Sequence, residues 1–92
     1  MGITVYLSGH LKGFADGKTE IVLSGRFSSV DEVLAELWRE HPALRDRVLD
    51  EQGEIRQHVN IFEGDRDVKR LGGLGTRLSA GDVHIFNAVS GG

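Results

Sequence analysis

The chain has 92 residues, of which 39% are hydrophobic and 27% charged, with one proline and no cysteine. This length predicts a single domain too small to enclose a drug-sized cavity, so we expect function at the surface or at a terminus. The lack of cysteine excludes disulfides, a thiolate nucleophile and a thiolate metal site. The formal net charge of −3 argues against nucleic acid as a partner.

The chain shows no sign of targeting to a membrane or of export. Its first residues lack the charged start and long apolar run of a signal peptide. No stretch approaches the roughly 18 apolar residues that a membrane span requires. We therefore expect a cytoplasmic protein without membrane contacts.

Two strands are predicted at the start of the chain. Apolar and polar residues alternate over residues 3–7 and again over 19–23, the period-two pattern of a strand with one buried face. The glycine-containing segment 8–18 between them is predicted to be a long hairpin loop, with Phe14 folded over the edge of the core. The two strands are expected to pair antiparallel.

A helix is predicted next. Ser29 precedes Glu32 by three residues, which is the spacing of a capping box. Apolar residues then recur at helical spacing, at Val30, Val33, Leu34, Leu37 and Trp38. Pro42 ends this helix near residue 40 or 41, and a second short helix is plausible over 43–49.

The middle of the chain returns to extended structure. A polar turn over 50–54 leads into a predicted strand over 55–62. A tight connection at 63–65 follows, and then a short strand over 67–69, whose single apolar residue Val68 suggests an exposed edge.

The last part of the chain completes the predicted sheet. In the glycine-rich segment 71–82, Leu74 and Leu78 are predicted to pack into the core. Residues 83–88 alternate between apolar and polar and are predicted to form a final strand beside the first. This order predicts an α+β fold in which one main helix packs across a mixed sheet of four to five strands. Residues 1–92 are expected to form one domain with a flexible C-terminal tail over 89–92.

The tail ends in two consecutive glycines, Gly91 and Gly92. One explanation of these glycines is a frayed chain end without a function. Glycine, however, lets a backbone approach a partner or a nucleotide closely, and a tail leaving a strand can enter a narrow channel. A carboxylate becomes an acyl donor only after activation, and this chain carries no nucleotide-binding motif, so a partner must activate Gly92.

Several short runs carry a resemblance to a known family. They are Val59-Asn60-Ile61-Phe62, Asp67-Val68, Gly73-Leu74, Gly81-Asp82 and Ala88-Val89-Ser90-Gly91-Gly92. Together they resemble the ThiS/MoaD family of ubiquitin-like sulfur carriers, and from about His58 onward its MoaD-like and CysO-type members. The sequence departs from many relatives at Asn87, where they have proline, and at Glu63-Gly64, where they have Asn-Gly.

The resemblance implies a β-grasp fold and a carrier that is not itself an enzyme and binds no cofactor. It also implies that an E1-like adenylating enzyme of the MoeB/ThiF type uses ATP to adenylate Gly92. Sulfur then displaces AMP, and the resulting thiocarboxylate gives its sulfur to a biosynthetic enzyme. Cysteine, molybdopterin, thiamine and a secondary metabolite all remain open as the end product.

Alternation also predicts a docking face. If the apolar strand residues face the helix, then Tyr6, Phe62 and Phe86 form an exposed aromatic strip on the opposite face. We expect this strip to dock the activating enzyme, unless Phe14 covers it or the rings only pack on each other. The predicted partner-binding residues are Tyr6, Phe62, Phe86, His84, Val89 and Ser90, and His58 and Asn60 are expected on the same face.

Other functions stay open at this point. His10, His41, His58 and His84 lack metal-ligand spacing except for a possible cross-strand pair of His58 and His84, and we expect no metal site. The alternatives to a sulfur carrier are the small subunit of a molybdopterin synthase, a ubiquitin-like modifier that forms isopeptide bonds through Gly92, and a non-covalent β-grasp binding module.

Overall fold

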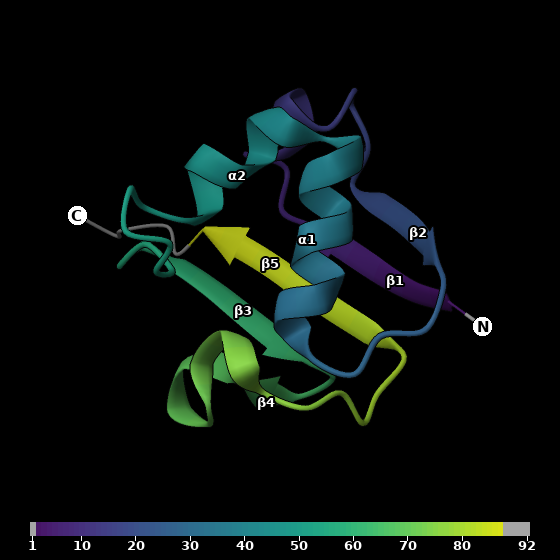
Figure 1. The fold of residues 1–92 in the computed structure, drawn as a ribbon. Coiled ribbons are helices and arrows are strands. Elements are labelled where there is room, and N and C mark those ends of the chain that lie inside the picture. The colour runs from purple at the N-terminus through teal and green to yellow at the C-terminus, as the bar shows by residue number, and fades with distance from the viewer. Residues whose placement is uncertain (1, 88–92) are drawn as a thin grey trace.

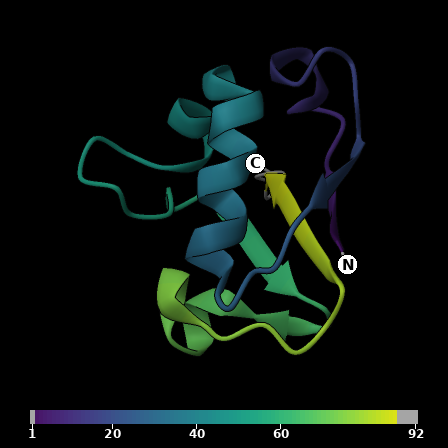
Figure 2. The same cartoon turned by 45° about the vertical axis from the view of Figure 1, so that its right-hand side comes forward.

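A computed structural model describes residues 2–87 and places a mixed sheet behind two helices (Figures 1 and 2). The helices and strands, in chain order, are β1 (Gly2–Leu7), β2 (Glu20–Ser24), α1 (Val30–Glu40), α2 (Pro42–Val48), β3 (Val59–Glu63), β4 (Arg66–Asp67) and β5 (Asp82–Asn87). Short 3₁₀ turns lie at Lys12–Phe14, Val68–Arg70 and Gly73–Gly75. The described part of the chain holds no helix long and apolar enough to cross a membrane.

The sheet confirms the predicted mixed topology. Its strand order is β2-β1-β5-β3-β4, with β1 and β5 parallel at the centre and the other neighbours antiparallel. A parallel pair needs a crossover, and the chain between β1 and β5 provides it through α1, which lies across one face of the sheet (Figure 1). The opposite face carries no described helix.

Helix α1 begins where the sequence predicts it. Ser29 is the N-cap, and its hydroxyl accepts a hydrogen bond from the Glu32 amide at 3.4 Å. The Glu32 carboxylate accepts from the amide of Ser28 at 2.7 Å, one residue earlier than in a standard capping box. Pro42 ends α1 and also starts α2, because its fixed φ suits the first position of a helix.

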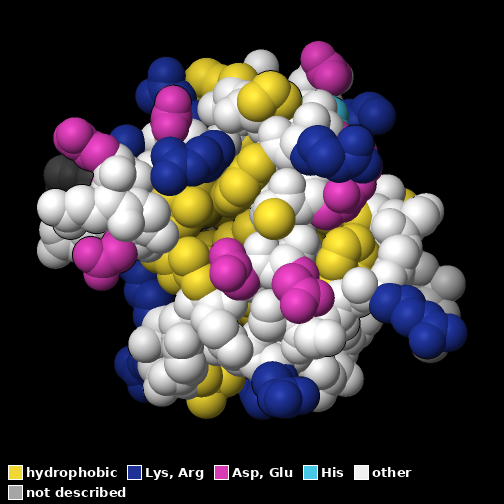
Figure 3. Space-filling model, viewed as in Figure 1, with side chains coloured by type: hydrophobic (Ala, Val, Ile, Leu, Met, Phe, Trp, Pro, Cys, Tyr) yellow, Lys and Arg dark blue, Asp and Glu magenta, His cyan; other side chains and the backbone are white. Residues whose placement is uncertain are grey.

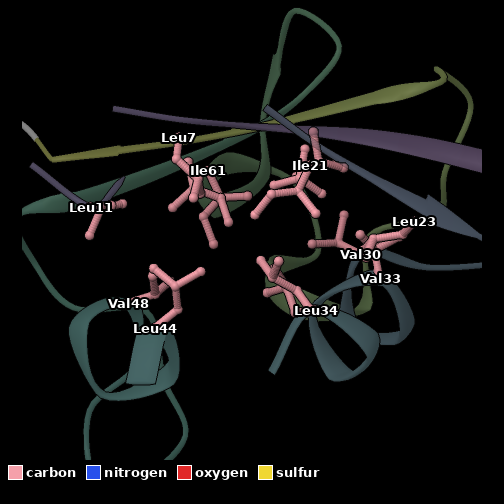
Figure 4. Packing of buried hydrophobic residues seen from close by; sticks show 14 of the residues in the cluster. Leu7, Leu11, Ile21, Leu23, Val30, Val33, Leu34, Leu44, Val48 and Ile61 are labelled. Atoms are coloured by element: carbon pink, nitrogen blue, oxygen red, sulfur yellow. The ribbon is translucent and has the colours of Figure 1, made fainter. Parts of the chain in front are cut away.

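The core lies between the helices and one face of the sheet. Figure 4 shows side chains of α1 and α2 pointing toward those of the strands. The apolar strand residues predicted to face the helix are buried. They are Ile3, Val5, Leu7, Ile21, Leu23, Val59, Ile61, Val83 and Ile85. Phe14, Trp38, Leu74 and Leu78 pack against this core as predicted, although each is only partly buried. Leu11 and Ala15 are fully buried too, and the glycine-rich loop pattern around them did not predict it.

Two predicted strand boundaries are wrong. The strand predicted over 55–62 begins only at Val59, because Ile55 makes a single bridge to Leu49 and the chain then turns. The ammonium group of Lys69 stabilises this turn by donating to the carbonyl oxygens of Arg56 and Gln57, each at 3.2 Å.

The strand predicted over 67–69 is also shorter than expected. Strand β4 ends at Asp67, whose carboxylate accepts from the amide of Lys69 at 3.0 Å and so starts a 3₁₀ turn. The turn directs Val68 into the core, where it is fully buried rather than exposed at an edge.

Candidate functional site

The predicted carrier residues Val89, Ser90, Gly91 and Gly92 lie outside the described residues. The structure does fix where they begin, because β5 ends at Asn87, which pairs with Val59 of β3. The C-terminal end of the central strand β5 is therefore the starting point of the carrier segment.

Four of the predicted partner-binding residues lie together on the face of the sheet away from α1. They are Tyr6, Phe62, His84 and Phe86. Tyr6 stacks on His84 with ring centroids 4.9 Å apart and planes 13° apart. Phe62 and Phe86 form a second pair with centroids 5.6 Å apart. Tyr6 is 38% exposed and Phe86 36% exposed, while Phe62 is half-buried. These residues form an aromatic strip, as the alternation predicted.

Phe14 does not cover this strip. Its ring packs against the core on the helix side, with the guanidinium carbon of Arg47 from α2 lying 4.4 Å from its centroid. The aromatic rings of the strip do pack on one another, yet Tyr6 and Phe86 still keep more than a third of their surface exposed. Both properties suit a preformed surface for a protein partner.

Asp82 also lies on this face, which was not predicted from the sequence. The carboxylate of Asp82 lies 2.5 Å from Nε2 of His84 and holds the imidazole against Tyr6. The spacing of two residues along one strand was the available signal, because such residues share a face.

The prediction for His58 is wrong. His58 lies in the turn before β3 and not on the open face of a strand. In the register of β3 and β5, His84 lies opposite Phe62, so the suggested cross-strand pair of histidines does not form. Within residues 2–87, no group of three or more His, Asp or Glu side chains is arranged to hold a metal ion.

A buried carboxylate fixes the chain just before β5. The side chain of Glu63 is fully buried, and it accepts hydrogen bonds from the Ser79 amide at 2.7 Å, from the Ala80 amide and from the Arg66 guanidinium. Burial alone would raise the pKa of this carboxyl, but those hydrogen bonds and the charge of Arg66 outweigh it, so the pKa lies below its usual value. Glu63 thus sets the entry of the strand that carries His84, Phe86 and the tail.

An open hollow lies at the other end of the sheet. It has a volume of about 510 Å³ and is an open groove between the starts of β1 and β5 and the segment after β2. Its position is opposite the end of β5 from which the carrier segment continues. The groove is therefore not part of the aromatic strip or of the carrier site.

Comparison with known proteins identifies the chain. A family model described as the ThiS family matches residues 5–92, which includes β5 and the diglycine end. The chain belongs to the ThiS family. This finding confirms the resemblance drawn from the sequence motifs, and the match reaches the residue predicted to carry sulfur.

Two relatives of this ThiS-family chain are a modifier and a carrier by name. Small archaeal modifier protein 3 of Haloferax volcanii is 39% identical over 66 residues, which are 71% of each chain. Sulfur carrier protein CysO of Mycobacterium tuberculosis is 32% identical over 95 residues and covers 100% of both chains. These relatives support a sulfur carrier role and leave the modifier role as a plausible alternative.

The fold comparison agrees. A chain in the crystal structure of the Amycolatopsis orientalis BexX/CysO complex superposes with a TM-score of 0.84, covering 98% of this chain and 99% of that one. Its identity of 24% makes it a comparison of fold alone. The β-grasp, ubiquitin-like fold expected for the ThiS family is confirmed.

Proposed function

We propose that this ThiS-family chain carries sulfur on Gly92 as the substrate of an E1-like adenylating enzyme. The observation that carries the proposal is the similarity to sulfur carrier protein CysO over the whole of both chains, together with a family match that runs to residue 92. The chain itself is small and has no nucleotide-binding motif, which supports a carrier that another protein activates.

The proposed chemistry takes place at the terminal carboxylate. A Gly92 oxygen attacks the α-phosphate of ATP in the active site of the partner, which forms an acyl adenylate and releases pyrophosphate. A sulfide-equivalent nucleophile then attacks the acyl carbon, AMP leaves, and the thiocarboxylate remains. Gly91 and Gly92 suit this step because a backbone without Cβ atoms can enter a narrow active site. Val89 and Ser90 would line the entry to that site.

The experiment that tests the proposal is mass spectrometry of the intact chain. The purified protein is incubated with an E1-like adenylating enzyme of the MoeB/ThiF type, ATP and a sulfur source. We expect the mass change of one oxygen replaced by sulfur, located by fragmentation at Gly92. An unchanged C-terminus with every adenylating enzyme of the source organism contradicts the proposal.

Protein conjugation is the second candidate, favoured by the similarity to Small archaeal modifier protein 3. In that case a target lysine, rather than sulfide, attacks activated Gly92 and forms an isopeptide bond. Diglycine remnants on lysines of other cellular proteins would support conjugation. A thiocarboxylate without such remnants would support sulfur transfer.

We further propose that the aromatic strip docks the activating enzyme. The Amycolatopsis orientalis CysO chain, which shares the fold, forms a complex with BexX, so a protein of this shape presents a surface to a partner. On this chain the stacked pair of Tyr6 and His84 and the pair of Phe62 and Phe86 are ordered aromatic surface beside the strand that leads to the tail. Aromatic side chains dominate the binding energy of protein interfaces.

Replacing Phe62 and Phe86 with serine is expected to weaken binding to the adenylating enzyme by about 10- to 100-fold, the range expected for the loss of interface anchors. Because both rings lie outside the core cluster, the free energy of unfolding should fall by no more than about 2 kcal/mol. Titration calorimetry and thermal melting measure the two effects. Leu71→Ser, which removes an exposed apolar residue that lies on no strand, is the control and should bind normally. An unchanged dissociation constant for the double variant contradicts docking through the strip.

A further inference from the structure

The open face carries a single row of side chains that crosses all five strands of the described sheet. Glu20 lies opposite Tyr6, Tyr6 opposite His84, His84 opposite Phe62, and Phe62 opposite Asp67. Directly opposed residues point to the same face, so these five side chains form one line. We call it the acid-capped row, because three aromatic rings separate a carboxylate at each end.

The centre of the acid-capped row is held in place before any partner binds. Tyr6 and His84 are stacked, and the carboxylate of Asp82, two residues earlier on the same face of β5, holds the imidazole. An interface whose side chains are already ordered loses less entropy on binding. The row therefore presents fixed ring surfaces with a fixed spacing of charge.

The charged strand residues on this face all have the same sign. Among the described strands the only Lys or Arg residue is Arg66, and it is turned to the other face, where it pairs with Glu63. The charged strand residues on the open face are Glu20, Asp67 and Asp82, all acidic. By contrast, Figure 3 shows Lys and Arg side chains mixed with Asp and Glu on the face that bears α1. The two faces of the domain thus differ in charge as well as in shape.

One cation approaches the row from outside the strands. The guanidinium Nε of Arg70 lies 3.8 Å from a carboxylate oxygen of Asp67, and the side chain of Arg70 is 88% exposed. The side chain of Asp67 is less exposed, at 23%, but the separation of 3.8 Å exceeds hydrogen-bond distance, so a cation on a partner surface can replace Arg70. Asp67 therefore remains available as an end of the row.

We propose that the acid-capped row selects a partner surface that carries an apolar ridge with one cationic side chain at each end. The two cationic groups lie about 19 Å apart. The spacing follows from four steps between neighbouring strands of about 4.8 Å each. The inference rests on the proposed function, since the partner is the docking surface of the adenylating enzyme. The ridge packs on Tyr6, His84 and Phe62, while the two cations reach Glu20 and Asp67.

Arginine fits both positions better than lysine. Its planar guanidinium binds a carboxylate through two parallel hydrogen bonds and also stacks on an aromatic ring, and each end of the row places a carboxylate beside a ring. A second copy of this chain does not fit, because two acidic faces would repel each other and the chain carries a net charge of −3.

The proposal is tested by the association rate between this chain and the purified E1-like adenylating enzyme. For Glu20→Lys/Asp67→Lys we expect association about 10- to 100-fold slower than for the wild type at about 50 mM salt, because charges at the edge of an interface act mainly on the association rate. The difference should shrink at about 500 mM salt, where exposed charges are screened. Stopped-flow fluorescence or surface plasmon resonance gives these rates.

Two further variants separate the row from general charge. Glu40→Lys/Glu51→Lys changes the net charge by the same amount at exposed positions outside the strands, and it should slow association less than threefold. Glu20→Gln/Asp67→Asn removes both charges but keeps the side-chain oxygen that accepts from Lys69. It should give an intermediate rate even if the lysine variant fails to fold.

Each outcome has a distinct meaning. If the wild type is adenylated but all variants associate at the same rate, the acid-capped row plays no part, and the proposed function stands. If association depends on the row but Gly92 is never adenylated, the row is supported and the proposed function falls. If the wild type does not bind the enzyme, both are overturned.

Discussion

Deleting Gly92 is expected to abolish formation of the C-terminal thiocarboxylate without lowering the melting temperature. The deletion leaves a glycine at the end, so the chemical group survives, but it lies about 3.5 Å short of its place in the partner. A displacement of about 1 Å can cost about 100-fold in rate, so the loss should be at least that large. The buried hydrophobic core of the described chain ends at Ile85, which is why stability should not change.

The measurement is the initial rate of adenylate formation, followed by pyrophosphate release, with mass spectrometry of the product. Glu51→Ala changes an exposed side chain outside the strands and leaves the tail and its diglycine end intact, so it is the control and should react within about threefold of the wild type. A wild-type rate for the chain without Gly92 would show that the reactive atom lies elsewhere.

Replacing Glu63 with alanine should lower the free energy of unfolding by about 3–5 kcal/mol, because it leaves buried donors without their acceptor. The carboxylate accepts from the amides of Ser79 and Ala80 and from Arg66, and its side chain is fully buried. Urea unfolding gives the change in free energy. Glu51→Ala removes an exposed carboxylate and should change it by less than about 0.5 kcal/mol. Equal stability of the two variants would refute a structural role for Glu63.

The pH dependence of the free energy of unfolding, measured for the wild type and for Glu63→Ala, provides an independent check. The pKa of the Glu63 carboxyl lies below the usual value of 4.5 in the folded chain. A lowered folded pKa means that the stabilisation is fully present above the unfolded pKa and is lost as pH falls through the folded one. The stability difference between wild type and Glu63→Ala should therefore be constant above about pH 6 and shrink towards about pH 3. A difference that grows on acidification would contradict the direction of the shift.

The sequence was most informative where one local pattern decides the outcome. The helical spacing after Ser29 and the alternation in the first and last strands predicted α1, β1 and β5, because burial of one face imposes a period on the residues. The same alternation predicted that Tyr6, Phe62, His84 and Phe86 share a face. The diglycine end and the family were also evident from the sequence, since both are properties of the covalent chain.

Local sequence patterns did not predict the turns that long-range contacts stabilise. Residues 55–58 have an extended pattern, yet the ammonium group of Lys69 holds their carbonyl oxygens in a turn. Val68 looked like an exposed edge residue, but the side chain of Asp67 starts a turn that buries it. A side chain that binds distant backbone overrides local propensity, and nothing in the neighbouring sequence records it.

The tertiary structure alone decided the two features on which the further predictions depend. Glu63 is buried because the amides of Ser79 and Ala80, far along the chain, converge on it. Glu20 and Asp67 become the two ends of one row only because the strand order brings five separate segments into register. The sequence by itself determined α1, β1 and β5, the diglycine end and the family, because these are local or covalent properties. Spacing and charge across the sheet depend on pairing between distant strands, so only the folded chain defines them.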